Sequence, residues 1–147
     1  MPRITRSALL MYSADQMFNL VNDVNAYPDF LPGCTGTRIL DEHDNQMTAA
    51  VVVAKAGISK TFTTKNTLIP GQEVKMDLVD GPFKKLTGGW TFKALDETAC
   101  KVTLDLEFVF SSKLVELAFG RIFTDLVNNM VQSFTERAKE VYGVDQN

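Results

Sequence analysis

The chain has 147 residues, of which 45% are hydrophobic and 22% charged, and its formal net charge at pH 7 is −3. These values are typical of one globular domain with a sizeable core, and they exclude a disordered tail, a fibre and a disulfide scaffold. The acidic balance disfavours bulk binding of nucleic acid but allows a local basic patch. No apolar run reaches the ~18 residues of a membrane span, and the first residues lack a secretory signal, so a cytoplasmic location is expected.

The N-terminal segment predicts a strand, a helix and a proline-rich break. Residues 2–11 are predicted to form the strand. The residues from Ser13 to Gln16 have the pattern of a capping box, which predicts that a helix begins there. The two prolines of the segment 27–32 disfavour helical geometry at Tyr27 and Leu31, so this segment is expected to be non-helical.

Six strand-like segments follow from residue 34, and short turn signals separate them. Short connections of this kind predict an antiparallel meander. The alternation of apolar and mostly polar residues is clearest in the last segment, at Val102, Leu104, Leu106, Phe108 and Phe110. One face of the sheet is therefore expected to be buried and the other largely solvated.

The C-terminal segment changes to a helical period and predicts one helix of ~30 residues from Ser112 to about Tyr142. Ser112 is the expected N-cap and Gly143 the expected stop. The apolar stripe is predicted to be broad and to include Leu114, Val115, Ala118, Phe119, Ile122, Phe123, Leu126, Val127, Met130, Val131 and Phe134. A one-faced sheet and a helix with such a stripe predict an α+β fold in which the sheet curves around the helix, with a bend near Gly88 and Gly89. A sheet that grips a helix often fails to close at one end, which predicts a pocket.

This order of elements is that of the helix-grip, or START-like, fold. Residues 20–34, LVNDVNAYPDFLPGC, resemble the hallmark segment of the coenzyme Q-binding START-like family in the polyketide cyclase/dehydrase superfamily. Residues 57–66, 80–92 and 113–134 are similar to a bacterial branch of that family whose members are ribosome association toxins. The resemblance runs over nearly the whole chain, 1–147, as a single domain.

The resemblance implies two functions. The main expectation is a non-enzymatic chaperone or carrier that binds a polyprenyl quinone such as ubiquinone, or a similar isoprenoid lipid, and supports respiration through transient contact with the inner membrane. The alternative is a toxin that binds the large (50S) ribosomal subunit and blocks association of the subunits, with an antitoxin as a further partner. The resemblance alone does not rank these two functions.

The residues indicate no catalytic set, so no enzyme activity and no required cofactor are expected. No Ser or Cys lies in a nucleophile elbow, and Asp105 and Glu107 fall on the polar face of their strand as solvated charges. His43, the single histidine, lies in an acidic turn, so no metal site is expected. Cys34 and Cys100 match no metal or redox motif and are expected to be reduced, buried thiols, with a disulfide as the alternative.

The expected ligand site is the apolar face between the late strands and the last helix. Large flexible and aromatic side chains suit an isoprenoid tail, although plain core is the alternative for each of them. The predicted lining consists of Met76, Leu78, Trp90, Phe92, Leu106, Phe108, Phe110, Phe119, Ile122, Phe123, Leu126 and Met130. In the strand 58–69, Phe62 shares its parity with Thr64 and Asn66. These two polar residues are predicted to contact a ligand head group, unless a register shift turns them to solvent.

Two further sets of residues bear on function. Tyr27, Phe30 and Leu31 are expected near the mouth of the pocket, either as a gate for a lipid or as a structural plug. Lysines flank two turns and are candidates for contact with ribosomal RNA phosphates, with ordinary surface lysines as the alternative. They are Lys55, Lys60, Lys65, Lys84 and Lys85. No recognised RNA-binding motif accompanies them.

Overall fold

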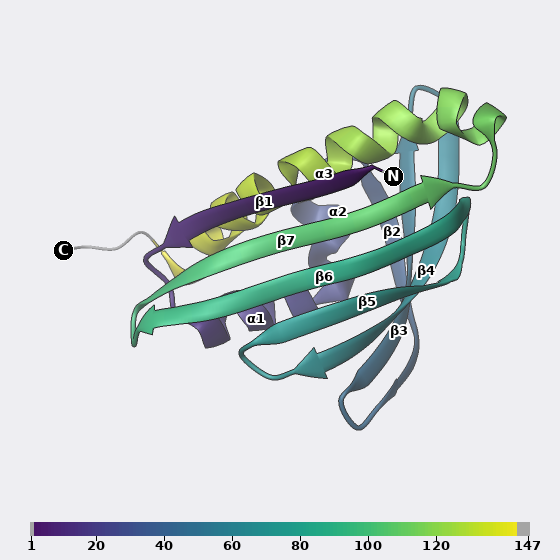
Figure 1. Cartoon of the computed structure of the whole chain (residues 1–147). Helices are drawn as coiled ribbons and strands as arrows, with labels where there is room; N and C mark the ends of the chain where they lie inside the picture. Colours follow the sequence, from purple (N-terminus) through teal and green to yellow (C-terminus); the bar gives the residue numbers. More distant parts are fainter. Residues whose placement is uncertain (1, 144–147) are drawn as a thin grey trace.

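A computed structural model describes residues 2–143 as a curved antiparallel sheet wrapped around one long helix (Figure 1). The strands are β1 (Arg3–Leu10), β2 (Cys34–His43), β3 (Gln46–Lys55), β4 (Ile58–Ile69), β5 (Glu73–Asp80), β6 (Phe83–Asp96) and β7 (Ala99–Phe110). The helical segments are α1 (Ala14–Asn22), the 3₁₀ turn η1 (Val24–Ala26), α2 (Tyr27–Phe30) and α3 (Lys113–Tyr142).

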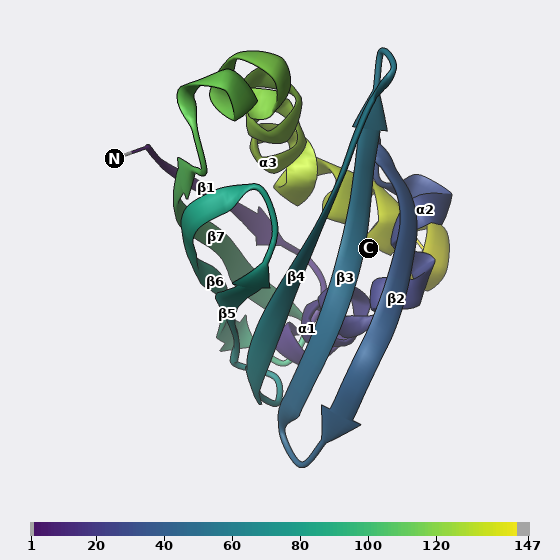
Figure 2. The same cartoon turned by 90° about the vertical axis from the view of Figure 1, so that its right-hand side faces the viewer.

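The strand order is β1-β7-β6-β5-β4-β3-β2, and every neighbouring pair is antiparallel. The six strands from β2 to β7 form the predicted meander. The N-terminal strand β1 pairs with β7 and forms one edge of the sheet. Figure 2 shows the two halves of the curved sheet on either side of α3. The α+β helix-grip architecture predicted from the sequence is therefore confirmed.

The start of α1 follows the predicted capping box. Ser13 Oγ accepts a hydrogen bond from the Gln16 backbone N–H at 3.0 Å, and Gln16 Oε1 accepts one from the Ser13 N–H at 2.8 Å. The prediction that Tyr27 is not helical is wrong: its φ and ψ are −52° and −44°, and it begins the short helix α2. Pro28 lies in the first turn of α2, where a missing N–H leaves no hydrogen bond unmade. Leu31 is extended, as expected.

Two adjacent glycines allow β5, β6 and β7 to approach closely where the sheet bends. Gly88 and Gly89 have φ values of +131° and +148°, which favour glycine. A Cβ atom on Gly88 would lie 2.0 Å from the carbonyl oxygen of Asp105 on β7. A Cβ atom on Gly89 would lie 1.9 Å from the carbonyl oxygen of Val74 on β5. Both positions therefore require glycine for steric as well as conformational reasons.

The helix α3 has the predicted length of 30 residues and the predicted caps. Ser112 Oγ accepts a hydrogen bond from the Val115 N–H at 3.1 Å, and Gly143 ends the helix with a positive φ. The stripe is narrower at its start than predicted, because Leu114 and Ala118 are exposed. At 100° per residue, Leu114 lies about 140° around the helix from Phe119, which is fully buried.

The two cysteines are free and buried, as predicted. Burial raises the pKa of both thiols, so they stay protonated and unreactive at neutral pH. Within residues 2–143, no helix combines the length and the apolar character needed to cross a membrane.

Candidate functional site

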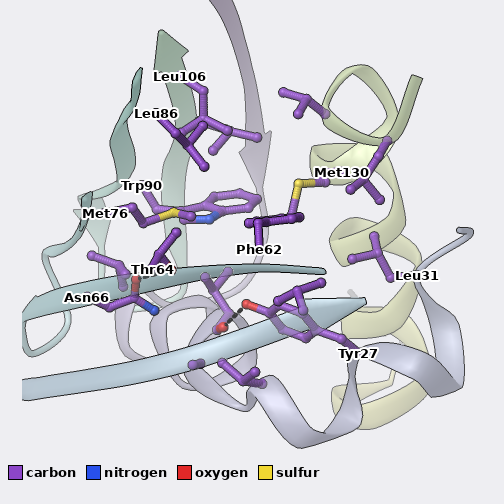
Figure 3. A pocket seen from close by; sticks show the side chains of 18 of the residues that line it. Tyr27, Leu31, Phe62, Thr64, Asn66, Met76, Leu86, Trp90, Leu106 and Met130 are labelled. Carbon is purple, nitrogen blue, oxygen red and sulfur yellow. Dashed lines mark hydrogen bonds between the residues drawn. The ribbon is translucent and has the colours of Figure 1, made fainter. Parts of the chain in front are cut away.

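A small apolar cavity lies between the inner face of the sheet and the helices α1 and α3 (Figure 3). Its volume is about 50 Å³. One water molecule needs roughly 10–15 Å³ of such free space, whereas pockets for drug-sized ligands usually measure about 300–1,000 Å³. The cavity therefore has room for only a few water molecules, and a larger ligand has to displace side chains of the wall.

Most of the predicted lining and part of the predicted mouth meet at this cavity. The predicted residues that line it are Tyr27, Leu31, Phe62, Thr64, Asn66, Met76, Trp90, Leu106, Phe123, Leu126 and Met130. In Figure 3, Trp90 and Met76 come from the sheet side, whereas Met130 comes from α3. Strand parity and helical period therefore identified the two facing walls correctly.

The other predicted residues do not line the cavity. They are Phe30, Leu78, Phe92, Phe108, Phe110, Phe119 and Ile122. Close-packed rings fill the space near the start of α3, where Phe110 stacks on Phe83 with ring centroids 5.3 Å apart. At the opposite end, α1 covers Phe92 through an edge contact with Phe18. Parity identifies the face on which a side chain lies but not how far along the strand the cavity extends.

The remaining predicted residues that do not line the cavity lie near the surface of the protein. Leu78 and Ile122 are half-buried and pack against the edge of the core. The Phe30 ring lies outside the cavity against Phe134, with ring centroids 5.1 Å apart, and the Arg137 guanidinium lies over it at 5.1 Å. Phe30 thus belongs to the outer surface of the α2 segment and not to a mouth.

Several lining residues were absent from the sequence prediction. They are Val21, Asn22, Val24, Ala49, Val51, Val74, Leu86, Leu104 and Val127. Most of them carry a usable signal, because Leu104 shares the parity of Leu106 and Val21 lies on the predicted apolar face of α1. Asn22 carries no such signal, since a polar residue at the end of a helix usually faces water.

Thr64 and Asn66 lie on the inner face of β4, as their parity predicted, and both are buried. The register between β4 and β5 does shift at Thr63 and Thr64, but the shift does not turn these side chains to solvent. Thr64 Oγ1 donates a hydrogen bond to Asn66 Oδ1 at 2.9 Å. This bond leaves the amide N–H groups of Asn66 as donors for another group (Figure 3).

Asn22 adds an acceptor to the same cavity. Its Oδ1 atom is buried and has no hydrogen-bond partner among the described residues. Leaving such a group unpaired costs about 1–3 kcal/mol, so the site favours an occupant that donates a hydrogen bond there. The cavity therefore combines apolar walls with amide groups able to donate and to accept.

Tyr27 and Leu31 close the cavity on the side of η1 and α2. The Tyr27 hydroxyl donates to the carbonyl oxygen of Val21, and its ring packs edge-on against Phe134 at 5.4 Å. Burial raises the pKa of the Tyr27 phenol, so it remains a neutral donor over the working pH range. This wall segment is thus tied to both α1 and α3.

The predicted cluster of three lysines around Gly57 is wrong in one member. Lys55 and Lys60 lie close to the β3–β4 turn, whereas Lys65 is directly opposite Asp77 on β5. Lys60 and Lys65 are five residues apart on one strand, which separates them by about 16 Å and places them on opposite faces. Lys65 therefore belongs to a cross-strand pair of opposite charges.

Lys84 and Lys85 differ in whether their ammonium groups are free to bind an RNA phosphate. Lys84 is exposed, whereas Lys85 Nζ bonds to Glu107 Oε2 at 2.6 Å. This contact lowers the pKa of Glu107, so the carboxylate stays charged and neutralises the lysine.

The carboxylate of Asp105 is also paired with a cation. It accepts hydrogen bonds from Arg3 at 2.9 and 2.7 Å, and Arg3 lowers its pKa. Both carboxylates lie on the polar face of β7, as predicted, and the register additionally places a cation beside each of them.

A curved antiparallel sheet around a long helix, with an apolar cavity between them, defines a START-like, helix-grip protein. A START superfamily protein from Mycobacterium smegmatis shares this fold, with a TM-score of 0.78 and 17% identity over 95% of this chain and 98% of that chain. Residues 10–135 match the family described as polyketide cyclase / dehydrase and lipid transport, and the chain belongs to that family.

Two curated relatives bear on the function. The ribosome association toxin RatA of Escherichia coli K12 is 63% identical over 142 residues, which cover 97% of this chain and 90% of that protein. The mitochondrial coenzyme Q-binding protein COQ10 homolog B of Xenopus laevis is 28% identical over 143 residues, which cover 95% of this chain and 59% of that protein. Both branches named by the sequence resemblance are thus found, at very different identities.

Proposed function

We propose that this protein associates with the ribosome by binding the large subunit, and that it hinders the joining of the two subunits. One observation carries the proposal: 63% identity to a ribosome association toxin over 97% of the chain. This favours the alternative drawn from the sequence over the quinone carrier, whose named relative is 28% identical. The proposed function is binding, and it requires no catalytic residue, metal or cofactor. An antitoxin remains a proposed further partner.

The test of this proposal is sedimentation of the purified protein with isolated ribosomal subunits. We expect the protein to migrate with the large subunit in a sucrose gradient and to lower the yield of joined ribosomes in proportion to its amount. The small subunit alone serves as the control and should carry no protein. Absence from the large-subunit fractions, together with an unchanged yield of joined ribosomes, contradicts the proposal.

We also propose a second function, binding of an isoprenoid quinone such as ubiquinone in the cavity. The observation that favours it is the apolar cavity, in which the Asn66 amide can donate a hydrogen bond and the unpaired Asn22 Oδ1 can accept one. A quinone offers only acceptors, so Asn66 would donate to its carbonyl, and a hydroxyl of the reduced quinol would donate to Asn22. Because the cavity measures about 50 Å³, binding requires part of the wall to move.

The quinone proposal is tested by removing the polar groups while keeping the volume. Trp90, the only tryptophan, lines the cavity, so its fluorescence reports binding of decylubiquinone. We expect the variant Thr64→Val/Asn66→Leu to bind about two- to tenfold more weakly, since a hydrogen bond contributes about 0.5–1.5 kcal/mol. The exposed neighbour Thr61→Val is the matched control and should bind as the wild type does. Equal quenching in the cavity variant and the control, or no quenching at all, contradicts the proposal.

A further inference from the structure

The outer face of the sheet places two lysines directly opposite each other. In the register of the seven strands, three opposed pairs consist of two charged residues: Arg3 with Glu107, Lys65 with Asp77, and Lys93 with Lys101. The first two pairs combine opposite charges. The third pair combines like charges, which destabilises an antiparallel sheet when the side chains are directly opposite.

Neither lysine of this pair is neutralised. Both are exposed, and no carboxylate oxygen of residues 2–143 lies within 4.0 Å of either ammonium group. Leu9 of β1 lies opposite Lys101 on the other flank and is 71% exposed, so no counter-charge comes from there. Beyond Lys93, Asp96 Oδ1 is occupied by hydrogen bonds from Thr98.

The adjacent row of the same face is rich in hydroxyl groups. Its hydroxyl residues are Ser7 on β1, Thr103 on β7 and Thr91 on β6, which are paired across the three strands, and Glu73 on β5 lies opposite Thr91 at the far end of the row. Figure 1 shows these strands side by side, and α1 and α3 lie on the other side of the sheet. The two lysines and the hydroxyl row therefore form a surface, here called the lysine face, that no helix of the described chain covers.

We propose that the lysine face is a contact for the phosphate backbone of RNA, with Lys93 and Lys101 as its two cations. This inference rests on the proposed association with the ribosome and deepens it. Opposed side chains start about 4.5–5.5 Å apart, so two flexible ammonium groups can hold one phosphate or two consecutive ones. Bound phosphate cancels the repulsion between the lysines, and hydroxyl groups are common donors to phosphate and sugar oxygens.

The chemistry of the surface favours RNA over an anionic membrane. Contact with a lipid layer needs apolar side chains that insert beside the cations. Leu9, opposite Lys101, and Leu95, two residues beyond Lys93, are exposed apolar side chains on one flank of the lysines. The row on the other flank carries three hydroxyl groups, which suit an RNA backbone and do not insert into a lipid layer. The net charge of −3 makes the whole protein repel RNA, so docking depends on a local unneutralised patch of this kind.

The experiment compares two double variants that remove equal charge. Lys93→Gln/Lys101→Gln removes the proposed contact. Lys113→Gln/Lys139→Gln removes two lysines of α3 that have carboxylate neighbours at 3.9 and 3.8 Å. Binding to purified large-subunit RNA is measured by filter retention at several salt concentrations, in parallel with sedimentation with intact large subunits.

We expect the first variant to bind RNA at least roughly tenfold more weakly than the wild type. The slope of log affinity against log salt should fall by about 1.5–2, the value for two lost phosphate contacts, whereas the α3 variant keeps the wild-type slope. The melting temperature of the first variant should equal or exceed that of the wild type, because a like-charge pair is removed. A loss of RNA binding is then not a loss of folding.

The outcomes separate this inference from the proposed function. Equal RNA binding by the two variants, or no RNA binding by the wild type, overturns the lysine contact even if the wild type sediments with large subunits. Lysine-dependent RNA binding without sedimentation supports the contact and overturns the proposed function. Unchanged RNA binding with lysine-dependent binding to vesicles of phosphatidylcholine and phosphatidylglycerol overturns the inference in favour of a membrane contact.

Discussion

Replacing Gly89 by alanine is expected to destabilise the protein by at least about 3 kcal/mol. Two costs combine at this position. The φ value of +148° is unfavourable for any residue with a Cβ atom, and strained backbone of this kind costs about 1–3 kcal/mol. The added methyl group also meets the carbonyl oxygen of Val74 at 1.9 Å, and this backbone atom is held in the β5–β6 ladder. The strands must separate to relieve the clash.

The measurement is equilibrium unfolding in urea followed by circular dichroism. Gly57→Ala is the matched control, because Gly57 has a φ of +82° but no atom within 4 Å of its added Cβ. It therefore reports the conformational cost alone, about 1–2 kcal/mol. If the two variants lose equal stability, the close approach of β5 to β6 at the bend is not a constraint on this fold.

Replacing Phe123 by alanine is expected to cost about 3–5 kcal/mol. Phe123 is 1% exposed, and its ring is the centre of the aromatic cluster that fills the space near the start of α3. Ring centroids within about 6 Å of it belong to Phe62, Phe83, Phe108, Phe110 and Phe119. Its loss removes edge contacts to the first four of these rings and a tilted contact to Phe119, and it joins the vacated space to the cavity that Phe123 lines.

The same unfolding measurement tests this prediction. Leu117→Ala is the control on the same helix, since Leu117 is 75% exposed and its truncation should change stability by no more than about 0.5 kcal/mol. A loss below about 1.5 kcal/mol in the Phe123 variant contradicts the prediction. It would mean that the neighbouring rings collapse into the vacated space and that the cluster does not depend on a fixed packing.

Local signals in the sequence were sufficient for the elements of this fold. The capping box at Ser13, the N-cap at Ser112 and the stop at Gly143 depend on residues within one helical turn. The alternation in β7 reports which side chains face the core, because the side-chain period of a strand is fixed at two. Tyr27 shows the limit of such rules: a preference against helix before proline yields to the packing of Tyr27 on Phe134.

The sequence predicted which face of the sheet carries the cavity, but it did not predict how far the cavity extends along that face. Thr64 and Asn66 were placed on the inner face by parity, and the structure shows them buried in the cavity wall. Phe108 and Phe110 share that face and fill solid core, since the extent of the cavity depends on how rings from β6, β7 and α3 pack together. Asn22 entered the site through the approach of α1 to the sheet, for which no local pattern exists.

The sequence by itself determined the seven strands, the helices α1 and α3, their caps and most of their inward faces, because these depend on backbone preferences and on the periods of neighbouring residues. The charges on the outer face were decided only by the tertiary structure. Lys85 is neutralised by Glu107, Lys65 faces Asp77, and Lys93 faces Lys101, and all three relations depend on strand register. Register joins residues far apart in the chain, so it is settled by the packing of the whole sheet and not by any segment of it.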